Sequence, residues 1–226
     1  MLLSANAVII AIMFEIGDIN IIYIITVLVV ILISMTMHEA MHAYASYWLG
    51  DDTARLQGRL TINPIKHIDP FMTILLPLML AISGAPVFGG AKPVPFNPNK
   101  VRGDEWGIAL VAIAGPLTNF LIAFVVFGIW ALVNPQVEII NQFFMTAVYV
   151  NLGFFIFNII PIPPLDGSRV LYALAPDFVR KVMESIERFG VMIVFAFVLI
   201  ASPLLMRFMS DAMSTILNLF LFIFGF

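Results

Sequence analysis

The sequence predicts an all-α polytopic membrane protein with about five to six transmembrane helices, a short membrane-associated β-ribbon and a re-entrant segment. Two observations lead to this prediction. Hydrophobic residues make up 62% of the 226 residues and charged residues only 11%, whereas soluble proteins carry about 45–50% apolar residues. The apolar residues are also gathered in long stretches almost without charge, as expected for helices that cross a bilayer. We therefore expect a multi-pass integral membrane protein surrounded by lipid.

Candidate spans follow one another along the chain, and each is judged against the roughly 20 apolar residues that a spanning helix needs. They lie at residues 21–49, 106–133, 138–160, 189–206 and 213–226, of which the last is short. Residues 1–14 are too few to span comfortably, so they form either an interfacial helix or a short first span. This N-terminal stretch contains no Lys or Arg and no small-residue cleavage site, so we expect no removable signal peptide.

Three segments between the first and second spans are not expected to form a straight spanning helix. Residues 58–64 alternate in character, which indicates a short strand or ribbon. Residues 71–88 are apolar, but two prolines and a glycine interrupt them, so a straight span is disfavoured. Residues 89–98 are rich in Gly and Pro and are expected to be extended.

Basic residues predict the orientation of the chain, because Lys and Arg are enriched in cytoplasmic loops. They form three groups outside the spans: Arg55, Arg59 and Lys66; Lys92, Lys100 and Arg102; and Arg169, Arg180, Lys181 and Arg188. The loop between the spans at 106–133 and 138–160 contains no basic residue. We therefore expect all three groups on the cytoplasmic side. Residues 71–88 would then enter and leave the membrane by the same face, as a re-entrant hairpin covered by protein or water.

The first predicted span contains the sequence His-Glu-Ala-Met-His, residues 38–42. Positions i and i+4 of a helix share one face, so the imidazoles of His38 and His42 can reach one Zn²⁺. Glu39 then lies beside the metal as a general base. Ionisable side chains inside a membrane cost about 2.5–3.5 kcal/mol each on insertion scales. Three of them in one apolar helix therefore indicate a function, and we interpret the two histidines as metal ligands.

Asp166 is the best candidate for a third ligand, because a catalytic zinc site usually has three protein ligands and a water. It is the only acidic residue between Glu138 and Asp177, and it follows a Pro-rich break at the end of a span. An ordinary turn is the alternative, since Pro-Leu-Asp-Gly is a reasonable turn sequence. The sequence pattern leaves both roles open. His67 is a further candidate ligand, but an interfacial hydrogen bond is favoured for it, because ligation would require its loop to fold back.

Together these motifs resemble the site-2 protease family of intramembrane zinc metalloproteases, peptidase family M50. The resemblance rests on the His-Glu-Ala-Met-His motif, on Gly-Pro-Leu-Thr-Asn at 115–119, and on the run from Asn158 to Gly167 that ends in Pro-Leu-Asp-Gly. It covers about residues 20–175, which would form the catalytic core, with C-terminal helices at about 178–226. No segment is long or polar enough for an added regulatory domain. We therefore expect residues 1–226 to form a single minimal membrane domain.

The resemblance implies a zinc metalloendopeptidase that binds one Zn²⁺ per chain and hydrolyses peptide bonds in or near transmembrane helices of substrate proteins. It implies that Asp166 is the third zinc ligand. It also implies that Asn158 stabilises the oxyanion or holds substrate, although a helix-breaking role is equally compatible with its sequence position. Its active site would lie within the cell membrane near the cytoplasmic face, in agreement with the basic residues.

Further substrate contacts are expected around this site. Gly58, Thr61 and Asn63 of the expected ribbon would pair with an extended substrate by strand addition. Asn119 would contact substrate, pack helices or form a hydrogen bond near the site, because amides inside membranes commonly join helices.

A metal-binding membrane transporter and a non-catalytic membrane scaffold are the alternative functions, since intramembrane ionisable residues also form ion pathways. No repeated half is visible, as many transporters would show, and Glu39 supplies a base that neither alternative needs. The net charge of −3, without a basic patch, predicts no nucleic-acid partner. The absence of cysteine excludes disulfides and thiolate sites. The sequence predicts no particular oligomeric state.

Overall fold

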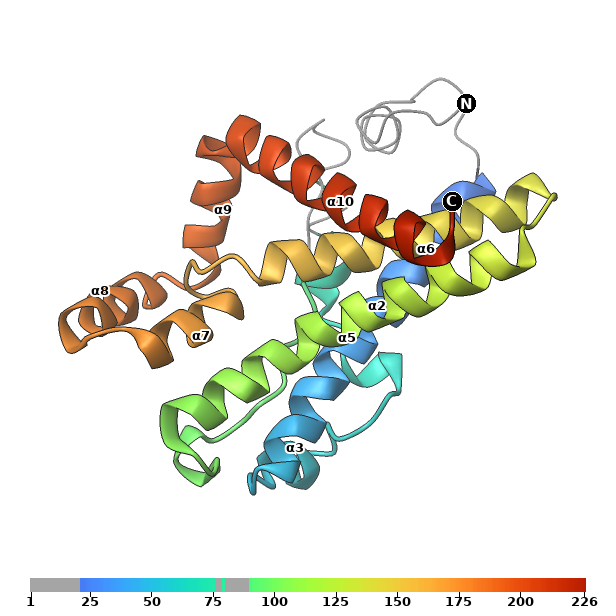
Figure 1. Cartoon of the computed structure of the whole chain (residues 1–226). Coiled ribbons are helices and arrows are strands. Elements are labelled where there is room, and N and C mark those ends of the chain that lie inside the picture. The colour runs from blue at the N-terminus through green and yellow to red at the C-terminus, as the bar shows by residue number, and fades with distance from the viewer. Residues whose placement is uncertain (1–20, 76–78, 80–89) are drawn as a thin grey trace.

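The computed structural model describes residues 21–75, 79 and 90–226, and the elements of this part are helices joined by loops (Figure 1). In chain order they are α2 (Ile21–Trp48), α3 (Thr53–Leu56), α5 (Asp104–Val133), α6 (Glu138–Asn158), α7 (Gly167–Leu174), α8 (Asp177–Glu187), α9 (Val191–Ile200) and α10 (Ser202–Phe224). Short 3-10 turns lie at Pro64–Lys66 and Pro98–Lys100, and a π-helical turn lies at Pro70–Leu75. The predictions for residues 1–14 and for most of 71–88 lie outside the described residues.

Four of these helices, α2, α5, α6 and α10, are long and apolar enough to cross a membrane. The first three lie against one another, and α10 runs over α6 and α5 (Figure 1). This arrangement confirms the prediction of a mainly helical membrane protein. The predicted number of about five to six spans is not confirmed, because the described residues provide four.

The C-terminal helices differ from the prediction in their boundary. The sequence predicts spans at 189–206 and 213–226, but the structure has a 10-residue α9 followed by a 23-residue α10. Pro203 explains this boundary, because proline is favoured in the first turn of a helix and cannot continue a preceding one. The polar stretch near Arg207 suggests a break, yet it is helical, with Arg207 Nε 3.9 Å from Asp211 Oδ2 one turn later on the exposed surface.

The β-ribbon predicted at residues 58–64 is not seen, and the described residues contain no strand. Instead this stretch makes turns that lead into the 3-10 turn Pro64–Lys66. Asn63 begins that turn, with its Oδ1 accepting a hydrogen bond from the Ile65 N–H at 3.1 Å. An Asn followed by Pro is a start signal for a helical turn. In this segment that local signal outweighs the alternation on which the strand prediction depends.

A core of aromatic and aliphatic side chains holds α10 against α5 and α6. Its buried members are Ala123, Phe127, Val148, Leu152, Ile156, Met213, Leu217 and Phe220. Phe220 is fully buried, and its ring centroid lies 5.7, 5.2 and 5.5 Å from those of Phe120, Phe124 and Phe127. Aromatic pairs at such tilted geometries add to the gain from packing.

Arg102 ties the end of α2 to the start of α5. Its guanidinium donates hydrogen bonds to the carbonyls of Trp48 (2.6 Å) and Leu49 (3.2 Å), and its backbone N–H donates to Leu49 as well (2.8 Å). Carbonyls in the last turn of a helix have no partner within the helix, so such a cap stabilises the end of α2. Because α5 begins at Asp104, the same residue sets the position of α5 beside α2.

We expect Phe220→Ala to destabilise the protein, because it removes the ring at the centre of the α5–α6–α10 core. Replacing a buried Phe by Ala lowers the free energy of unfolding of soluble proteins by about 3–5 kcal/mol. Phe222→Ala is the matched control, since Phe222 lies on the same helix but is 82% exposed. Thermal unfolding in detergent micelles should show a clearly lower midpoint for the first variant alone. Equal midpoints for the two variants would contradict the assigned core.

Candidate metal centre

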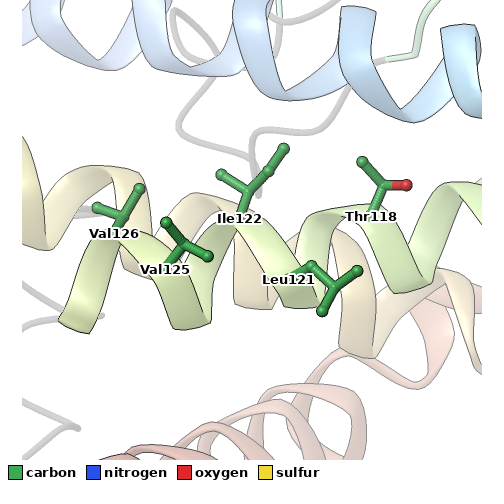
Figure 2. A pocket seen from close by; sticks show the side chains of 5 residues that line it. All are labelled: Thr118, Leu121, Ile122, Val125 and Val126. Carbon is green, nitrogen blue, oxygen red and sulfur yellow. The ribbon is translucent and has the colours of Figure 1, made fainter. Parts of the chain in front are cut away.

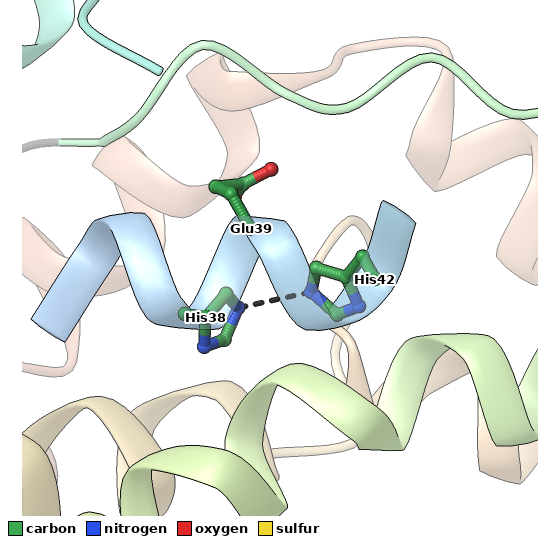
Figure 3. Close-up of side chains that lie close together, drawn as sticks. All are labelled: His38, Glu39 and His42. Carbon is green, nitrogen blue, oxygen red and sulfur yellow. Dashed lines mark hydrogen bonds between the residues drawn. The ribbon is translucent and has the colours of Figure 1, made fainter. Parts of the chain in front are cut away.

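The C-terminal half of α2 carries His38, Glu39 and His42, and the helix is unbroken through them. Both imidazoles lie on the side of α2 that faces α5 (Figure 3). Their Nε2 atoms are 3.0 Å apart, and the rings meet edge to face at 84°. Glu39 leaves a different side of the helix (Figure 3), yet ligand atoms of all three residues lie within 4.8 Å of one another.

Asp166 brings a carboxylate to the same two imidazoles from a distant part of the chain. Its Oδ2 lies 3.1 Å from His38 Nε2 and 3.4 Å from His42 Nε2. Asp166 directly precedes α7, where an Asp side chain commonly accepts a hydrogen bond from the first helical turn. No such bond is made here. The carboxylate is therefore turned away from its own helix and toward α2, which a simple turn role does not explain.

Both imidazoles donate from Nδ1 to acceptors on α5. The Nδ1 of His42 lies 2.8 Å from the backbone oxygen of Val111, which can only accept. The Nδ1 of His38 lies 2.6 Å from Oδ1 of Asn119. A neutral imidazole carries one N–H, so in both rings that proton is on Nδ1 and Nε2 presents a lone pair. The two lone pairs point into the same space.

A buried chain of hydrogen bonds fixes the orientation of the Asn119 amide. Asn119 Nδ2 donates to the Ser34 carbonyl at 3.2 Å and to Asn151 Oδ1 at 2.9 Å. Asn151 Nδ2 donates to the Ala147 carbonyl at 2.8 Å and to Ser34 Oγ at 2.9 Å. Backbone carbonyls only accept, so the two amide nitrogens must face them and the Asn119 oxygen must face His38.

Sequence reasoning singled out Asn119 but missed Ser34 and Asn151. All three are at most 2% exposed. Asn151 is an amide inside an otherwise apolar span, and that polarity is the signal that could have identified it. Asn119 is fully buried, and both the oxygen and the nitrogen of its side-chain amide form hydrogen bonds with other protein groups. These are the contacts of a residue that joins helices beside the site.

The three convergent atoms, Nε2 of His38, Nε2 of His42 and Oδ2 of Asp166, are all acceptors with no donor among them when both rings are neutral. Such a group is stable only with a cation between its members. The three separations are 3.0, 3.1 and 3.4 Å. Donor atoms around a tetrahedral Zn²⁺ with bonds of about 2.0–2.1 Å lie about 3.3 Å apart. Two imidazoles and one carboxylate are also ligand types that zinc accepts, so these residues fit a zinc ion.

Without a metal, protons must take the place of that cation. Partial burial by itself raises the pKa of the Asp166 carboxyl. Attraction to the His42 imidazolium and hydrogen bonds from both histidines lower this pKa by more, so it lies well below its usual range. The carboxylate is therefore ionised at neutral pH and available to bind a cation.

Two glycines make room for this arrangement. A Cβ on Gly115 of α5 would lie 2.5 Å from His42 Nε2 and 2.7 Å from His38 Nε2. A Cβ on Gly167 would lie 2.1 Å from the carbonyl oxygen of Ile159, at the end of α6. The first glycine lets α5 approach the imidazoles. The second lets the chain between α6 and α7 close tightly, which places Asp166 at the site.

Glu39 is held from the opposite side by an extended segment. Its Oε2 accepts a hydrogen bond from the Val94 N–H at 3.0 Å. The segment is itself fixed on both sides of this contact. Arg59 donates to the Lys92 carbonyl at 2.7 Å, and the Asn97 N–H donates to Asp51 at 2.7 Å. The extended backbone predicted for residues 89–98 is seen from residue 90 to the short turn at Pro98–Lys100.

Comparison with known protein families matches Peptidase family M50 over residues 26–145 and 133–201. The chain belongs to this family. It is 42% identical over 184 residues to "Putative zinc metalloprotease YwhC" of Bacillus subtilis, covering 78% of this chain and 80% of that protein. It is 28% identical over 178 residues to "Putative zinc metalloprotease Rip2" of Mycolicibacterium smegmatis, covering 78% of this chain but only 66% of Rip2. No solved structure matches the chain.

The M50 match includes His38, Glu39, His42 and Asp166. The hydrogen bonds of the predicted site residues Asn158, His67, Thr61 and Asn63 are local and do not reach these four side chains. Asn158 ends α6 and is half-buried, and its Nδ2 donates to the Phe154 carbonyl at 3.0 Å. His67 is 2% exposed and bonds the Thr61 carbonyl through Nε2 at 2.8 Å. Thr61 Oγ1 in turn accepts from the Asn63 N–H at 3.1 Å, and Gly58 occupies a turn at φ +64°.

An apolar hollow of about 260 Å³ lies on the surface of α5 in this M50 chain. Figure 2 shows the residues that line it: Thr118, Leu121, Ile122, Val125 and Val126. None of these side chains is ionisable, so the hollow provides no group for hydrolysis. Its lining belongs to a helix apolar enough to span a bilayer, where lipid chains or other apolar helices are the available neighbours.

We expect Gly115→Ala to lose bound zinc, because the new methyl group would occupy the space of both Nε2 atoms. Gly153→Ala on α6 is the matched control, since a Cβ there has no neighbour within 4 Å. Metal analysis of the purified proteins after equal dialysis should show zinc in the control and little in Gly115→Ala. Full zinc content in both variants would show that the ion does not bind where these imidazoles converge.

Proposed function

We propose that this M50 chain is an intramembrane zinc endopeptidase that hydrolyses peptide bonds in or near transmembrane helices of other proteins. The observation that carries the proposal is the convergence of His38, His42 and Asp166, with Glu39 beside them, among helices apolar enough to span a membrane. Membership of a peptidase family supports it. So do the names of YwhC and Rip2, which describe zinc metalloproteases.

We assign His38, His42 and Asp166 as ligands of one zinc ion per chain. The bound metal would lower the pKa of a water toward about 7 and polarise the carbonyl of the peptide bond to be cut. The protein prepares the site before metal arrives. Hydrogen bonds to Asn119 and to the Val111 carbonyl keep both imidazoles in the tautomer that binds through Nε2.

Glu39 is assigned as the general base, which accepts a proton from water and delivers it to the leaving amine. Its Oε2 is occupied by the Val94 N–H, whereas Oε1 accepts no hydrogen bond within the described part of the chain. Val94 lies between Pro93 and Pro95, which have no N–H. The Val94 amide is therefore the one backbone donor of this three-residue stretch. It holds one carboxylate oxygen and leaves the other for the proton transfer.

A substrate must present an extended peptide, because backbone hydrogen bonds shield the peptide bonds of an intact helix. Asn158 is the candidate to stabilise the oxyanion, since it lies at the start of the tight loop that ends at Asp166. For this role its amide must leave the Phe154 carbonyl and turn toward the cluster. Gly58, Thr61 and Asn63 stay candidates for substrate contact through the turns that they form, rather than as a strand.

The four spans and the basic residues together support a cytoplasmic site. Sequence segments 49–103 and 159–201 would then lie on one side, and residues 134–137 on the other. Ten of the eleven Lys and Arg residues lie in the first two segments, and Arg207 lies in the second turn of α10, next to the same side. Positively charged loops are retained in the cytoplasm. We therefore place the Asp166 end of the site toward the cytoplasm of a cell membrane.

We expect Glu39→Gln to bind about one zinc per chain and to lose peptidase activity, because an amide keeps the shape but cannot accept the proton. Glu138→Gln, an exposed change at the start of α6, serves as the control that should leave activity intact. The measurement is cleavage of a model transmembrane substrate in liposomes, together with metal analysis. Substantial cleavage by Glu39→Gln would assign the base to another residue.

We expect Asp166→Asn to lose both zinc and activity while the protein still inserts and folds, because a neutral amide is a poor zinc ligand. Loss of a group that only supports a ligand typically costs about 10–100-fold in metal affinity, so loss of a ligand should cost at least that. Asp177→Asn provides an exposed control that should keep full zinc. If Asp166→Asn retains zinc at the control level, Asp166 is a turn residue and not a ligand.

We expect cysteines placed at Gln57, Lys100 and Asp177 to react with a membrane-impermeant maleimide from the cytoplasmic side only. A cysteine at Pro135 should react from the opposite side only. The natural chain has no cysteine, so each label reports one position. Reaction of positions 57 and 100 from opposite sides would show that residues 71–88 cross the membrane completely.

A further inference from the structure

Exposed apolar side chains lie along one side of α8 and in the turn that follows it. Phe178 and Val182, spaced i and i+4, lie about 40° apart around α8, and Phe189 follows in the turn after the helix ends at Glu187. They are 71%, 56% and 64% exposed. Leu174, at the end of α7, is also exposed. We call Phe178, Val182 and Phe189 the apolar row.

Polar side chains of α8 form hydrogen bonds and an ion pair with α7. Glu187 pairs with Arg169, and Glu184 accepts a hydrogen bond from the Tyr172 hydroxyl at 2.6 Å. Arg180 donates to the Tyr172 carbonyl at 3.0 Å, and its guanidinium lies 5.2 Å from the centroid of the Tyr172 ring. These bonds turn the charged side of α8 toward α7, so the apolar row faces away from α7.

This arrangement is the reverse of a helical hairpin in water, where apolar side chains face the partner helix and charged ones face solvent. In α8 the one buried apolar residue is Met183, on a different side from the apolar row. Burying a large apolar side chain gains about 1.5–3 kcal/mol, so three of them beside water would be a substantial cost. The apolar row therefore requires an apolar neighbour.

Basic side chains border the apolar row. Lys181, one turn after Phe178 on α8, and Arg188, which directly follows the helix and precedes Phe189, are both exposed. Neither takes part in an ion pair within the described residues. Long basic side chains beside an apolar strip can extend from the acyl region of a bilayer to its phosphate groups. Uncharged or acidic borders would not have this complementarity to anionic lipids.

We propose that α8 lies in the membrane–water interface, with the apolar row in the lipid and with Lys181 and Arg188 at anionic headgroups. Its place in the chain supports lipid as the neighbour, because α7 and α8 follow the end of the membrane-spanning α6. In Figure 1 α8 projects beyond that end of α6, away from the α2–α5–α6 bundle, whereas α7 packs against α5. Since α7 begins directly after Asp166, α8 is a lipid anchor for the helical pair that carries this carboxylate.

The test uses single cysteines at positions 178, 182 and 189, each labelled with a nitroxide in full-length protein in phosphatidylcholine–phosphatidylglycerol liposomes. Spin relaxation is measured with oxygen, which concentrates in lipid, and with a nickel chelate, which stays in water. Asp177→Cys on the polar side of α8 is the matched aqueous control, and Leu132→Cys on α5, 84% exposed, is the lipid reference.

At all three positions of the apolar row, as at position 132, we expect the relaxation enhancement by oxygen to exceed that by the nickel chelate several-fold. At position 177 we expect the nickel chelate to give the larger enhancement. Preferential access of the chelate along the row would overturn the proposal, because the row would then face water. Low access of both reagents would also overturn it, because a protein surface or a second copy of this chain would then cover the row. All labelled sites are exposed, so none of these substitutions removes a buried contact.

Discussion

The Nε2 atoms of His38 and His42 lie 3.0 Å apart with their lone pairs directed into one space, and the contacts around them maintain this arrangement. Two like acceptors at this distance repel unless a cation lies between them. The Val111 carbonyl and the Asn119 oxygen keep both protons on Nδ1, so the rings cannot relieve the repulsion by exchanging tautomers. The site is thereby prepared to bind a cation, either a metal ion or, in its absence, a proton.

This arrangement extends outward into the packing of three helices. Asn119 on α5 can face His38 only because Ser34 of α2 and Asn151 of α6 take up its nitrogen. Both amides of this hydrogen-bonded network, Asn119 and Asn151, find partners within the protein, which matters because unpaired polar groups are costly inside a membrane. A shift of one helix along another would break several of these bonds at once. The register of α2, α5 and α6 is therefore linked to the orientation of one imidazole.

Sequence reasoning succeeded where a local pattern determines the structure. Long apolar stretches predicted α2, α5 and α6, and the combined motifs predicted the M50 family, which the comparisons confirm. The structure brings His38, His42 and Asp166 together, although their roles stay predictions. The ribbon at 58–64 and the boundary between α9 and α10 were missed. In both places a single residue, Asn63 or Pro203, decided the local conformation against the pattern of its neighbours.

The remaining features could not be predicted because they depend on contacts between distant residues. Nothing near Val94 in the sequence indicates that its amide binds Glu39, which lies 55 residues earlier. Similarly, the hydropathy of α8 does not show which of its sides meets α7. Only the bonds from Arg169, Tyr172 and Arg180 show that the polar side is used within the protein. The three-dimensional structure therefore shows what the sequence does not, namely that α8 turns its apolar side away from α7.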